Sequence, residues 1–294
     1  MAYLSGFIAI VGPPNVGKST LLNRLIGSKL AIVSPKPQTT RNRILGVYHG
    51  NDFQIVFIDT PGIHRGTSTL HRSMVLSAQE SLREVDMVIL IIDIQRWEDP
   101  VIDTIIRDIG TNNRPCFLII NKIDTVPREE ILPVIDILRR KYRFRHIVPV
   151  SALKGDGITN LLGCIKTNLQ PGPVYFPEDM NTDQSESFFI SEIIREKIFL
   201  HARYELPYSS AVTVESIEEN KGKNMLSIMA RIHVESESQK VIMIGHKGGM
   251  IKKIGISARM ELERHFGKKV FLKLLARVEK NWSKDGRALR RFGY

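Results

Sequence analysis

The sequence of 294 residues has few of the features that would place a protein outside the cell or inside a membrane. No apolar run approaches the roughly 20 residues of a membrane-spanning helix, and the longest is residues 87–92. The first residues lack a basic region followed by an apolar stretch and a cleavage site, so secretion is not expected. The two cysteines, Cys116 and Cys164, form no Cys-x-x-Cys pair and are expected to be buried and reduced. These absences predict a cytoplasmic protein.

Acidic residues are scarce toward the C-terminus. Residues 240–294 contain 15 Lys and Arg but only 4 Asp and Glu, an excess equal to the net charge of +11 of the whole chain. A positive end of this kind favours a polyanionic partner, which can be RNA, DNA or an anionic membrane surface. A solvated basic face that only maintains solubility is the alternative that charge alone leaves open.

The first part of the chain alternates between short apolar runs and helix-like segments. This alternation predicts an α/β domain over residues 1–170, with a mostly parallel sheet covered on both faces. Residues 41–50 and the run that follows them fit an antiparallel hairpin at the sheet edge. The expected strands are 7–11, 53–58, 87–93, 115–121 and 146–151, and the expected helices follow Lys18 and cover 74–85, 100–109, 129–141 and 158–169.

A segment without periodicity separates this domain from a second one. Residues 171–184 are rich in proline and predict a linker. Residues 185–294 then predict a smaller α+β domain with a basic tail. Its expected elements are a helix over 185–204, strands over 209–219 and 225–235, a helix to about His265 and a strand over 268–279.

The stretch GPPNVGKST fits the phosphate-binding pattern G-x-x-x-x-G-K-[ST] and lies between an expected strand and an expected helix. Glycines let backbone N–H groups face the phosphates of a nucleotide, and the helix N-terminus adds its positive dipole end. The lysine of the pattern would reach the β- and γ-phosphates, and its serine hydroxyl would hold Mg²⁺. The residues expected to line this loop are Gly12, Pro13, Pro14, Asn15, Val16, Gly17, Lys18, Ser19 and Thr20.

Three further motifs end the later strands, in the order that a P-loop GTPase requires. Asp59 can hold Mg²⁺ through water and Gly62 can donate its N–H to the γ-phosphate. The Asp124 carboxylate can accept hydrogen bonds from guanine, which adenine does not offer in the same geometry. The three motifs are Asp59, Thr60, Pro61 and Gly62; Asn121, Lys122 and Asp124; and Ser151, Ala152 and Leu153. Together they predict a GTP and GDP site at the carboxyl ends of the strands.

The residues that act in hydrolysis are less fully specified by the pattern. One of Thr39 and Thr40 should complete the Mg²⁺ shell, and Thr40 is favoured. The residue after Gly62 is Ile63, which cannot orient the attacking water as a glutamine would. Asn15 could instead help to hold K⁺ beside the phosphates, or it could simply shape the loop. The expected catalytic set is Lys18, Asn15, Thr40 and Gly62, with Ser19, Thr40 and Asp59 as Mg²⁺ ligands.

A second glycine loop, within residues 241–255, lacks the Gly-Lys-Ser/Thr ending and fits I-G-x-x-G-x-x-I-K-x-I. A strand is expected to end at Gly245, followed by the turn and a helix that buries Ile251, Ile254, Ala258 and Leu262. This pattern is typical of a KH module, whose loop clamps single-stranded RNA. The expected RNA-binding residues are Ile244, Gly245, His246, Lys247, Gly248, Lys252 and Lys253.

Along nearly its whole length, the chain resembles the Era family of bacterial GTPases. The resemblance rests on GPPNVGKST, PKPQTTRNRILG, FIDTPGIH, NKID and VSALKG, and on FFISEIIREKIF, RIHVESESQKVIMIGHKGGMIKKIG and GRALRRFGY. It implies a GTPase domain followed by a KH domain of the prokaryotic type. The family's phosphate loop often has arginine at its second position, where this chain has Pro13.

The resemblance also implies a function. It implies GTP-dependent binding near the 3′ end of 16S ribosomal RNA, a role in maturation of the 30S subunit, and no DNA partner. It implies a cytoplasmic location with some peripheral association with the inner membrane. Two alternatives stay open: a GTPase directed to transfer RNA or a protein, and a membrane-surface regulator that uses the basic end on lipid.

Overall fold

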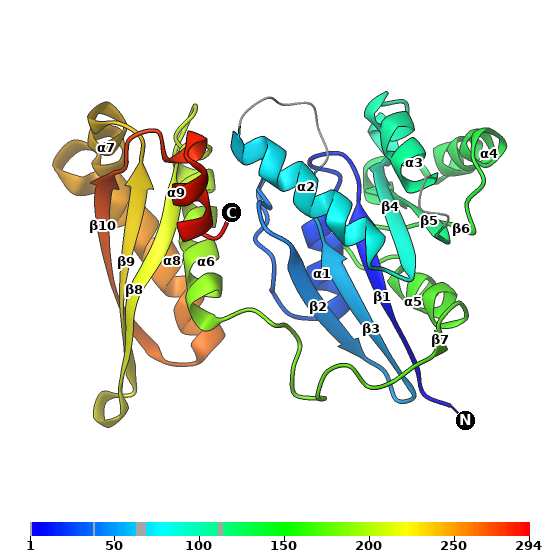
Figure 1. Ribbon diagram of the computed structural model, residues 1–294, viewed down its shortest axis with the longest axis horizontal. Coiled ribbons are helices and arrows are strands. Elements are labelled where there is room, and N and C mark those ends of the chain that lie inside the picture. Colours follow the sequence, from blue (N-terminus) through cyan, green and yellow to red (C-terminus); the bar gives the residue numbers. More distant parts are fainter. Residues whose placement is uncertain (1, 38, 63–68, 111–113) are drawn as a thin grey trace. The chain divides into compact units, whose positions relative to one another are not determined.

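The computed structural model describes residues 2–37, 39–62, 69–110 and 114–294 of the chain. These residues divide into two compact units (Figure 1). The first unit comprises most of the chain up to Asp183. The second unit comprises the residues from Gln184 onward, together with a short segment that includes residues 69–72. No helix in the described part of the chain is long and apolar enough to cross a membrane.

The first unit is built on a sheet that, among the described residues, has seven strands in the order β2-β3-β1-β4-β5-β6, with β7 paired to β1. Five strands are parallel, β2 is antiparallel to β3 at one edge, and β7 pairs antiparallel with the start of β1. The predicted α/β class and antiparallel edge are therefore confirmed. The bounds are β1 Leu4–Val11, β2 Ile44–His49, β3 Phe53–Asp59, β4 Met87–Asp93, β5 Cys116–Asn121, β6 His146–Pro149 and β7 Gln170–Pro171.

Helices cover both faces of this sheet because the central strands are apolar on both sides. One face packs against α1 and α5, and the other packs against α2, α3 and α4. The bounds are α1 Lys18–Ile26, α2 Thr69–Arg83, α3 Val101–Gly110, α4 Ile131–Lys141 and α5 Ile158–Lys166. The two cysteines of the described chain are free thiols that are half-buried rather than buried as expected.

The segment after β7 is tied to the first unit by hydrogen bonds. The Val47 N–H donates to the Asn181 carbonyl at 2.8 Å, and the Thr182 hydroxyl donates to the Leu45 carbonyl at 2.7 Å. The buried Gln54 side chain accepts the backbone N–H groups of Tyr175 and Phe176. The residues expected to form a linker thus follow a fixed path, on which Asn181 and Thr182 lie along the outer edge of β2.

The second unit is an α+β domain. Among the described residues, its sheet has three strands in the order β10-β9-β8, with β8 antiparallel and β10 parallel to β9. Helices α6 and α8 pack on each other and contribute Ile194, Ile198 and Leu262 to the buried interior. The bounds are α6 Glu186–His201, β8 Ala211–Asn220, β9 Met225–Val234, α7 Glu237–Ile244, α8 Gly249–Phe266, β10 Lys269–Val278 and α9 Gly286–Arg291.

The prediction of a strand ending at Gly245 is wrong, because residues Glu237–Ile244 form the helix α7. Ser236 caps this helix by accepting a hydrogen bond from the Gln239 N–H at 3.3 Å. The apolar run Val241–Ile244 therefore belongs to a helix, although its β-branched residues favour a strand when they are read alone.

The C-terminal residues cover one end of the outer face of β9. The indole N–H of the buried Trp282 donates to the Ser209 carbonyl at 2.9 Å, and the ring of Phe292 lies 4.5 Å from that of His233. Burial lowers the pKa of His233 to about 4, although Glu279 opposes this shift. The imidazole is therefore neutral in the folded protein, and its Nε2 contacts the Thr213 hydroxyl at 2.8 Å.

This histidine predicts acid sensitivity of the second unit. Between pH 6.5 and about 4 the unfolded chain takes up a proton at His233 that the folded chain excludes, so stability falls as the pH falls. The loss can reach about 3 kcal/mol. It can be measured by urea unfolding followed through Trp282 fluorescence in a Trp97→Phe background. A His233→Gln variant should lose much less stability over this range, and equal losses in both proteins would contradict the prediction.

Candidate functional site

The first glycine loop connects β1 to α1 and needs glycine at two positions. Gly17 has φ of 101°, and a Cβ there would lie 2.3 Å from the Asn121 amide nitrogen. A Cβ on Gly12 would lie 2.2 Å from the carbonyl oxygen of Ile91 in the buried strand β4. A side chain at either position would therefore displace the loop from the neighbouring strand ends.

Lys18, at the start of α1, folds back over the loop that precedes it. Its Nζ donates to the carbonyls of Gly12 at 3.1 Å and Pro13 at 2.8 Å. Burial lowers the pKa of Lys18 to about 8, and the charge of Asp59 opposes that shift. The ammonium group lies in a water-poor position, where an incoming phosphate would be a stronger partner than two neutral carbonyls.

Three oxygen-bearing side chains from separate elements meet beside this loop. The Ser19 hydroxyl lies 2.7 Å from the Thr40 hydroxyl and donates to the Asp59 carboxylate at 2.6 Å. Burial raises the pKa of Asp59 to about 6, against the opposing effect of Lys18. Its other oxygen, Oδ1, is buried and has no hydrogen-bond partner among the described residues. Hard oxygen ligands with an unsatisfied carboxylate oxygen fit Mg²⁺.

The two candidate threonines differ in their partners. The Thr39 hydroxyl donates to the Lys36 carbonyl at 2.8 Å and contacts the Ser34 hydroxyl at 2.8 Å, so it stabilises its own turn. The Thr40 hydroxyl is the one that reaches Ser19. This difference favours Thr40 as the metal ligand.

The Asp-Thr-Pro-Gly motif brings the end of β3 against the phosphate loop. Thr60 points inward, and its hydroxyl donates to the Ile10 carbonyl at 2.9 Å. At Gly62, a Cβ would lie 3.2 Å from both the Lys18 ammonium and the Pro14 Cα. This close approach keeps the Gly62 backbone beside the expected γ-phosphate position. Ile63 lies outside the described residues.

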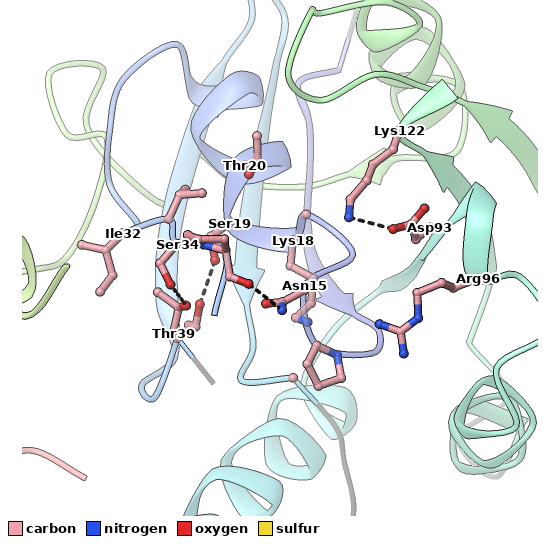
Figure 2. Close-up of a pocket in the computed structure, with 16 residues that line it drawn as sticks. Asn15, Lys18, Ser19, Thr20, Ile32, Ser34, Thr39, Asp93, Arg96 and Lys122 are labelled. Carbon is pink, nitrogen blue, oxygen red and sulfur yellow. Dashed lines mark hydrogen bonds and ion pairs between the residues drawn. The ribbon is translucent and has the colours of Figure 1, made fainter. Parts of the chain in front are cut away.

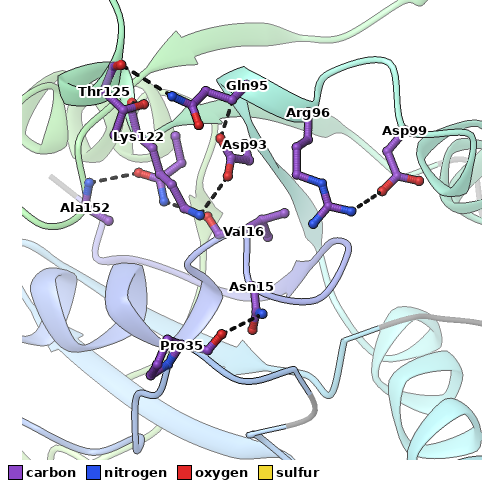
Figure 3. A network of polar contacts seen from close by, with 11 residues as sticks. Asn15, Val16, Pro35, Asp93, Gln95, Arg96, Asp99, Lys122, Thr125 and Ala152 are labelled. Carbon is purple, nitrogen blue, oxygen red and sulfur yellow. Dashed lines mark hydrogen bonds and ion pairs between the residues drawn. The ribbon is translucent and has the colours of Figure 1, made fainter.

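Asn121, at the end of β5, connects two of the predicted motifs, which the labelled Val16 and Ala152 represent in Figure 3. Its amide nitrogen donates to the Val16 carbonyl at 2.7 Å, and its amide oxygen accepts the Ala152 N–H at 2.9 Å. The residue is buried, so both bonds are shielded from water. Asn121 therefore fixes the distance between the phosphate loop and the loop expected to contact the base.

Two residues that the sequence analysis missed hold the expected base-binding loops. Arg24 on α1 donates from Nε to the Ala152 carbonyl at 3.1 Å and also contacts the Leu153 carbonyl. Asp93, at the end of β4, pairs with Lys122 at 2.7 Å. Asp93 could have been predicted because it ends a buried strand, as Asp59 and Asn121 do. Arg24 has no comparable signal, since it lies 128 residues from Ala152.

A cavity of about 550 Å³ opens between these loops (Figure 2). Ten of the predicted residues line it: Pro14, Asn15, Gly17, Lys18, Ser19, Thr20, Thr39, Thr40, Gly62 and Lys122. The structure adds Asp93 and Arg96 to this lining, together with Ile32, Val33, Ser34 and Pro35. Asp59 and Asn121 lie behind the lining and support it. Asp124 and residues 151–153 are outside the lining, on the loops that follow β5 and β6.

The second glycine loop joins α7 to α8. Gly245 and Gly248 both have φ of 76°, and the Gly248 N–H donates to the Gly245 carbonyl at 3.1 Å. A Cβ on Gly245 would lie 2.8 Å from Met250, whereas a Cβ on Gly248 would meet open space. His246 and Lys247 are exposed at the tip of the turn, and Lys252 and Lys253 are exposed on the first turns of α8.

On the other side of α8, the predicted core face is largely confirmed. Ile254, Ala258 and Leu262 are buried, and Ile251 is half-buried. The unit thus presents a tight glycine turn with lysines next to it, as a backbone clamp for a polyanion requires. Ile244 precedes the turn as the last residue of α7.

Comparison with known proteins agrees with both sites. Residues 7–122 match a family described as 50S ribosome-binding GTPase, and residues 205–283 match the KH domain family. The GTPase Era proteins of Syntrophus aciditrophicus and Geobacter metallireducens are each 48% identical over 292 residues. These alignments cover 99% of this chain, with 95% and 98% of the two relatives.

Two solved structures have the same fold over the whole chain. One is Era in complex with MgGDPNP and nucleotides 1506–1542 of 16S ribosomal RNA, with a TM-score of 0.96 and 42% identity. The other is a variant of Era from Aquifex aeolicus bound to GDP·AlF4⁻, with a TM-score of 0.96 and 43% identity. Each covers 99% of both chains. With its phosphate loop, KH-type glycine turn and full-length similarity, the chain belongs to the Era family of GTPases.

Proposed function

We propose that this protein binds and hydrolyses GTP and binds 16S ribosomal RNA near its 3′ end, as a nucleotide-controlled factor in assembly of the 30S ribosomal subunit. The main support for GTP binding and hydrolysis is the oxygen cluster of Ser19, Thr40 and Asp59 beside the buried Lys18. The relatives named GTPase Era and the Era complex with 16S ribosomal RNA support the RNA part.

Each residue of the nucleotide cavity has a role that follows from its position. Lys18 would exchange its two carbonyl partners for phosphate oxygens, and the backbone N–H groups of residues 14–19 would donate to the same phosphates. Ser19, Thr40 and Asp59 would hold Mg²⁺, which supplies charge neutralisation between the phosphates when bound. The Gly62 N–H would meet the γ-phosphate, which explains why Thr40 and Gly62 can report whether that phosphate is present.

We assign selection of guanine to the loops after β5 and β6. The Asp124 carboxylate would accept hydrogen bonds from the base, and the backbone of residues 151–153 would contact the base oxygen. Lys122 has φ of 64° and pairs with Asp93, which keeps its side chain extended along the cavity. The bonds from Asn121 and Arg24 to Ala152 hold this loop in place before any base arrives.

We further propose that Asn15 helps to hold a K⁺ ion during hydrolysis. Its amide nitrogen donates to the Pro35 carbonyl at 3.0 Å, so its amide oxygen is the atom available to a cation. A cation beside the phosphates would stabilise the charge that develops in the transition state. Hydrolysis should therefore be at least about tenfold faster in KCl than in NaCl, with the difference lost in Asn15→Ala. Equal rates in both salts, measured as released phosphate, would exclude this role.

The RNA site is tested best at Gly248. Because open space surrounds this position, Gly248→Asp adds a negative charge without a collision, and aspartate tolerates positive φ. We expect it to weaken binding of a 16S ribosomal RNA 3′ fragment by about 100-fold, through repulsion of the phosphate backbone. The matched control is Gly248→Asn, which has the same shape without the charge and should weaken binding far less.

Two results would contradict this assignment. Equal losses in Gly248→Asp and Gly248→Asn would mean that the turn geometry, rather than phosphate binding, is disturbed. Unchanged RNA affinity in both variants would favour a GTPase that acts on transfer RNA or a protein partner.

We propose a cytoplasmic location with peripheral contact at the inner membrane. The 15 basic residues of the last 55 positions would attract anionic lipid as well as RNA. Flotation of the full chain with anionic vesicles, with and without competing RNA, would show which polyanion this end prefers. We also propose that residues 1–170 form the GTP-binding domain and that residues 185–294 form the KH domain.

A further inference from the structure

A second cluster of basic residues belongs to the first unit rather than to the basic C-terminal end of the sequence. The stretch RRKYRFRH, residues 139–146, contains five Lys and Arg, two aromatic residues and one histidine. It spans the end of α4 and the start of β6 (Figure 1). A cavity of about 470 Å³ opens at this junction, and we call it the arginine cavity. Besides two isoleucines, its lining consists of Arg139, Arg143, Arg145, Tyr142, Phe144 and His146.

The positive charge of this cavity is largely uncompensated. Among the described residues that line it there is no aspartate or glutamate. Within the described part of the chain, no carboxylate lies within 4.0 Å of Arg139, Arg143 or Arg145. The nearby Asp103 already accepts the Tyr142 hydroxyl and the Lys141 ammonium, the latter at 3.2 Å. The excess charge therefore calls for an anion from outside the chain.

The backbone that carries these arginines is fixed on both sides. The Tyr142 N–H closes α4 on the Leu138 carbonyl at 3.0 Å, and the Arg145 N–H donates to the Cys116 carbonyl at 2.8 Å. The rings of Tyr142 and Phe144 lie 5.8 Å apart and pack against the core beneath. Binding an anion here would require ordering of the arginine side chains but no rearrangement of the chain.

The cavity is also separate from the nucleotide site. It includes His146, the first residue of β6, whereas the loop of Ser151 to Leu153 follows the carboxyl end of that strand. Since all the nucleotide loops lie at the carboxyl end of the sheet, the arginine cavity is at the opposite end. An anion bound there would not compete with GTP.

We propose that the arginine cavity is a second RNA-binding surface, which binds the sugar–phosphate backbone of RNA independently of the KH-type loop. Guanidinium groups suit phosphate because each can donate two parallel hydrogen bonds. Tyr142 and Phe144, placed between the arginines, offer ring surface for a base. A bilayer surface is a poorer fit, because the site is concave and both rings are half-buried rather than free to insert.

The test uses the full chain, 16S ribosomal RNA as the probe, and a Gly248→Asp background that removes the KH contribution. Arg139→Ala and Arg143→Ala should each lower the remaining affinity several-fold. Each should also reduce the slope of log affinity against log salt by about 0.7–0.9, the value for one lost phosphate contact. Arg143→Lys should restore most of the slope, since it keeps the charge. Arg128→Ala is the control, because Arg128 is also exposed, is on the same unit and is outside the cavity.

Two outcomes would overturn the proposal. One is that Arg139→Ala and Arg143→Ala behave as Arg128→Ala does, which would make the cavity a solvated basic surface. The other is that they reduce sedimentation with phosphatidylglycerol vesicles while RNA binding is unchanged, which would assign the cavity to a membrane. The background rests on the RNA site proposed at Gly248, and unchanged RNA affinity in Gly248→Asp alone would contradict that site. The arginine variants and Arg128→Ala are compared within one background, so their difference decides the arginine cavity separately.

Discussion

Replacing Lys18 by methionine is expected to lower the affinity for GTP by about 100-fold or more, because two or more charge-assisted bonds to phosphate are lost. Methionine keeps most of the length and the buried contacts of the lysine stem, and it removes the ammonium group. In the free protein that group is satisfied by the Gly12 and Pro13 carbonyls, which neutralise no charge. The difference in affinity between the two proteins therefore isolates the contribution of the lysine charge.

The measurement is a titration of each protein with a fluorescent GTP analogue in the presence of Mg²⁺. Lys166→Met is the matched control, since it removes the same charge from the same unit. Lys166 pairs with Asp52 at 2.6 Å and is outside the nucleotide cavity. If both variants lose the same affinity, the effect comes from the overall charge of the protein and the role given to Lys18 is wrong.

Replacing Asn121 by leucine is expected to lower both the free energy of unfolding and the affinity for GTP. Leucine has a similar size but can neither donate to Val16 nor accept from Ala152, so two buried backbone groups lose their partner. Each such loss costs about 1–3 kcal/mol, which predicts a destabilisation of about 2–6 kcal/mol. The phosphate loop and the base loop would then move independently, and the affinity for GTP should fall by about 100-fold.

The two effects are separated by measuring urea unfolding without nucleotide and GTP affinity at a temperature where the variant is folded. Asn23→Leu serves as the control, because Asn23 also makes several side-chain bonds to the backbone of this unit. It should destabilise the protein while changing GTP affinity about twofold at most. An Asn121→Leu protein that is destabilised but binds GTP normally would show that the bridge stabilises the fold alone.

Much of the nucleotide site could be predicted because its residues lie at strand ends in the order of a known pattern. A parallel sheet brings the carboxyl ends of its strands to one edge, so Ser19 and Asp59 meet although 40 residues separate them. The sequence favoured Thr40 over Thr39 as the metal ligand but could not decide between them. The choice depends on which of the two hydroxyls bonds within the turn that begins at Ser34, and the path of the backbone determines this.

The error at α7 has a specific physical origin. The run Val241–Ile244 is apolar and, apart from Met243, β-branched, and β-branched residues favour a strand. Ser236 and Gln239 form a helix-start signal that outweighs this preference, because a capped helix can bury Met243. The arginine cavity could be read from the sequence as a basic run. Its concave shape could not, because it arises where α4 and β6 meet.

The pairing of Asn181 and Thr182 with β2 has a consequence for how the protein behaves in a crowded solution. As the last strand of the sheet, β2 would otherwise expose a row of unpaired N–H and C=O groups. Here the Val47 N–H donates to the Asn181 carbonyl, and the Leu45 carbonyl accepts the Thr182 hydroxyl. The chain's own connecting segment thereby denies that edge to a strand from another molecule, and so protects the GTPase domain from edge-to-edge aggregation.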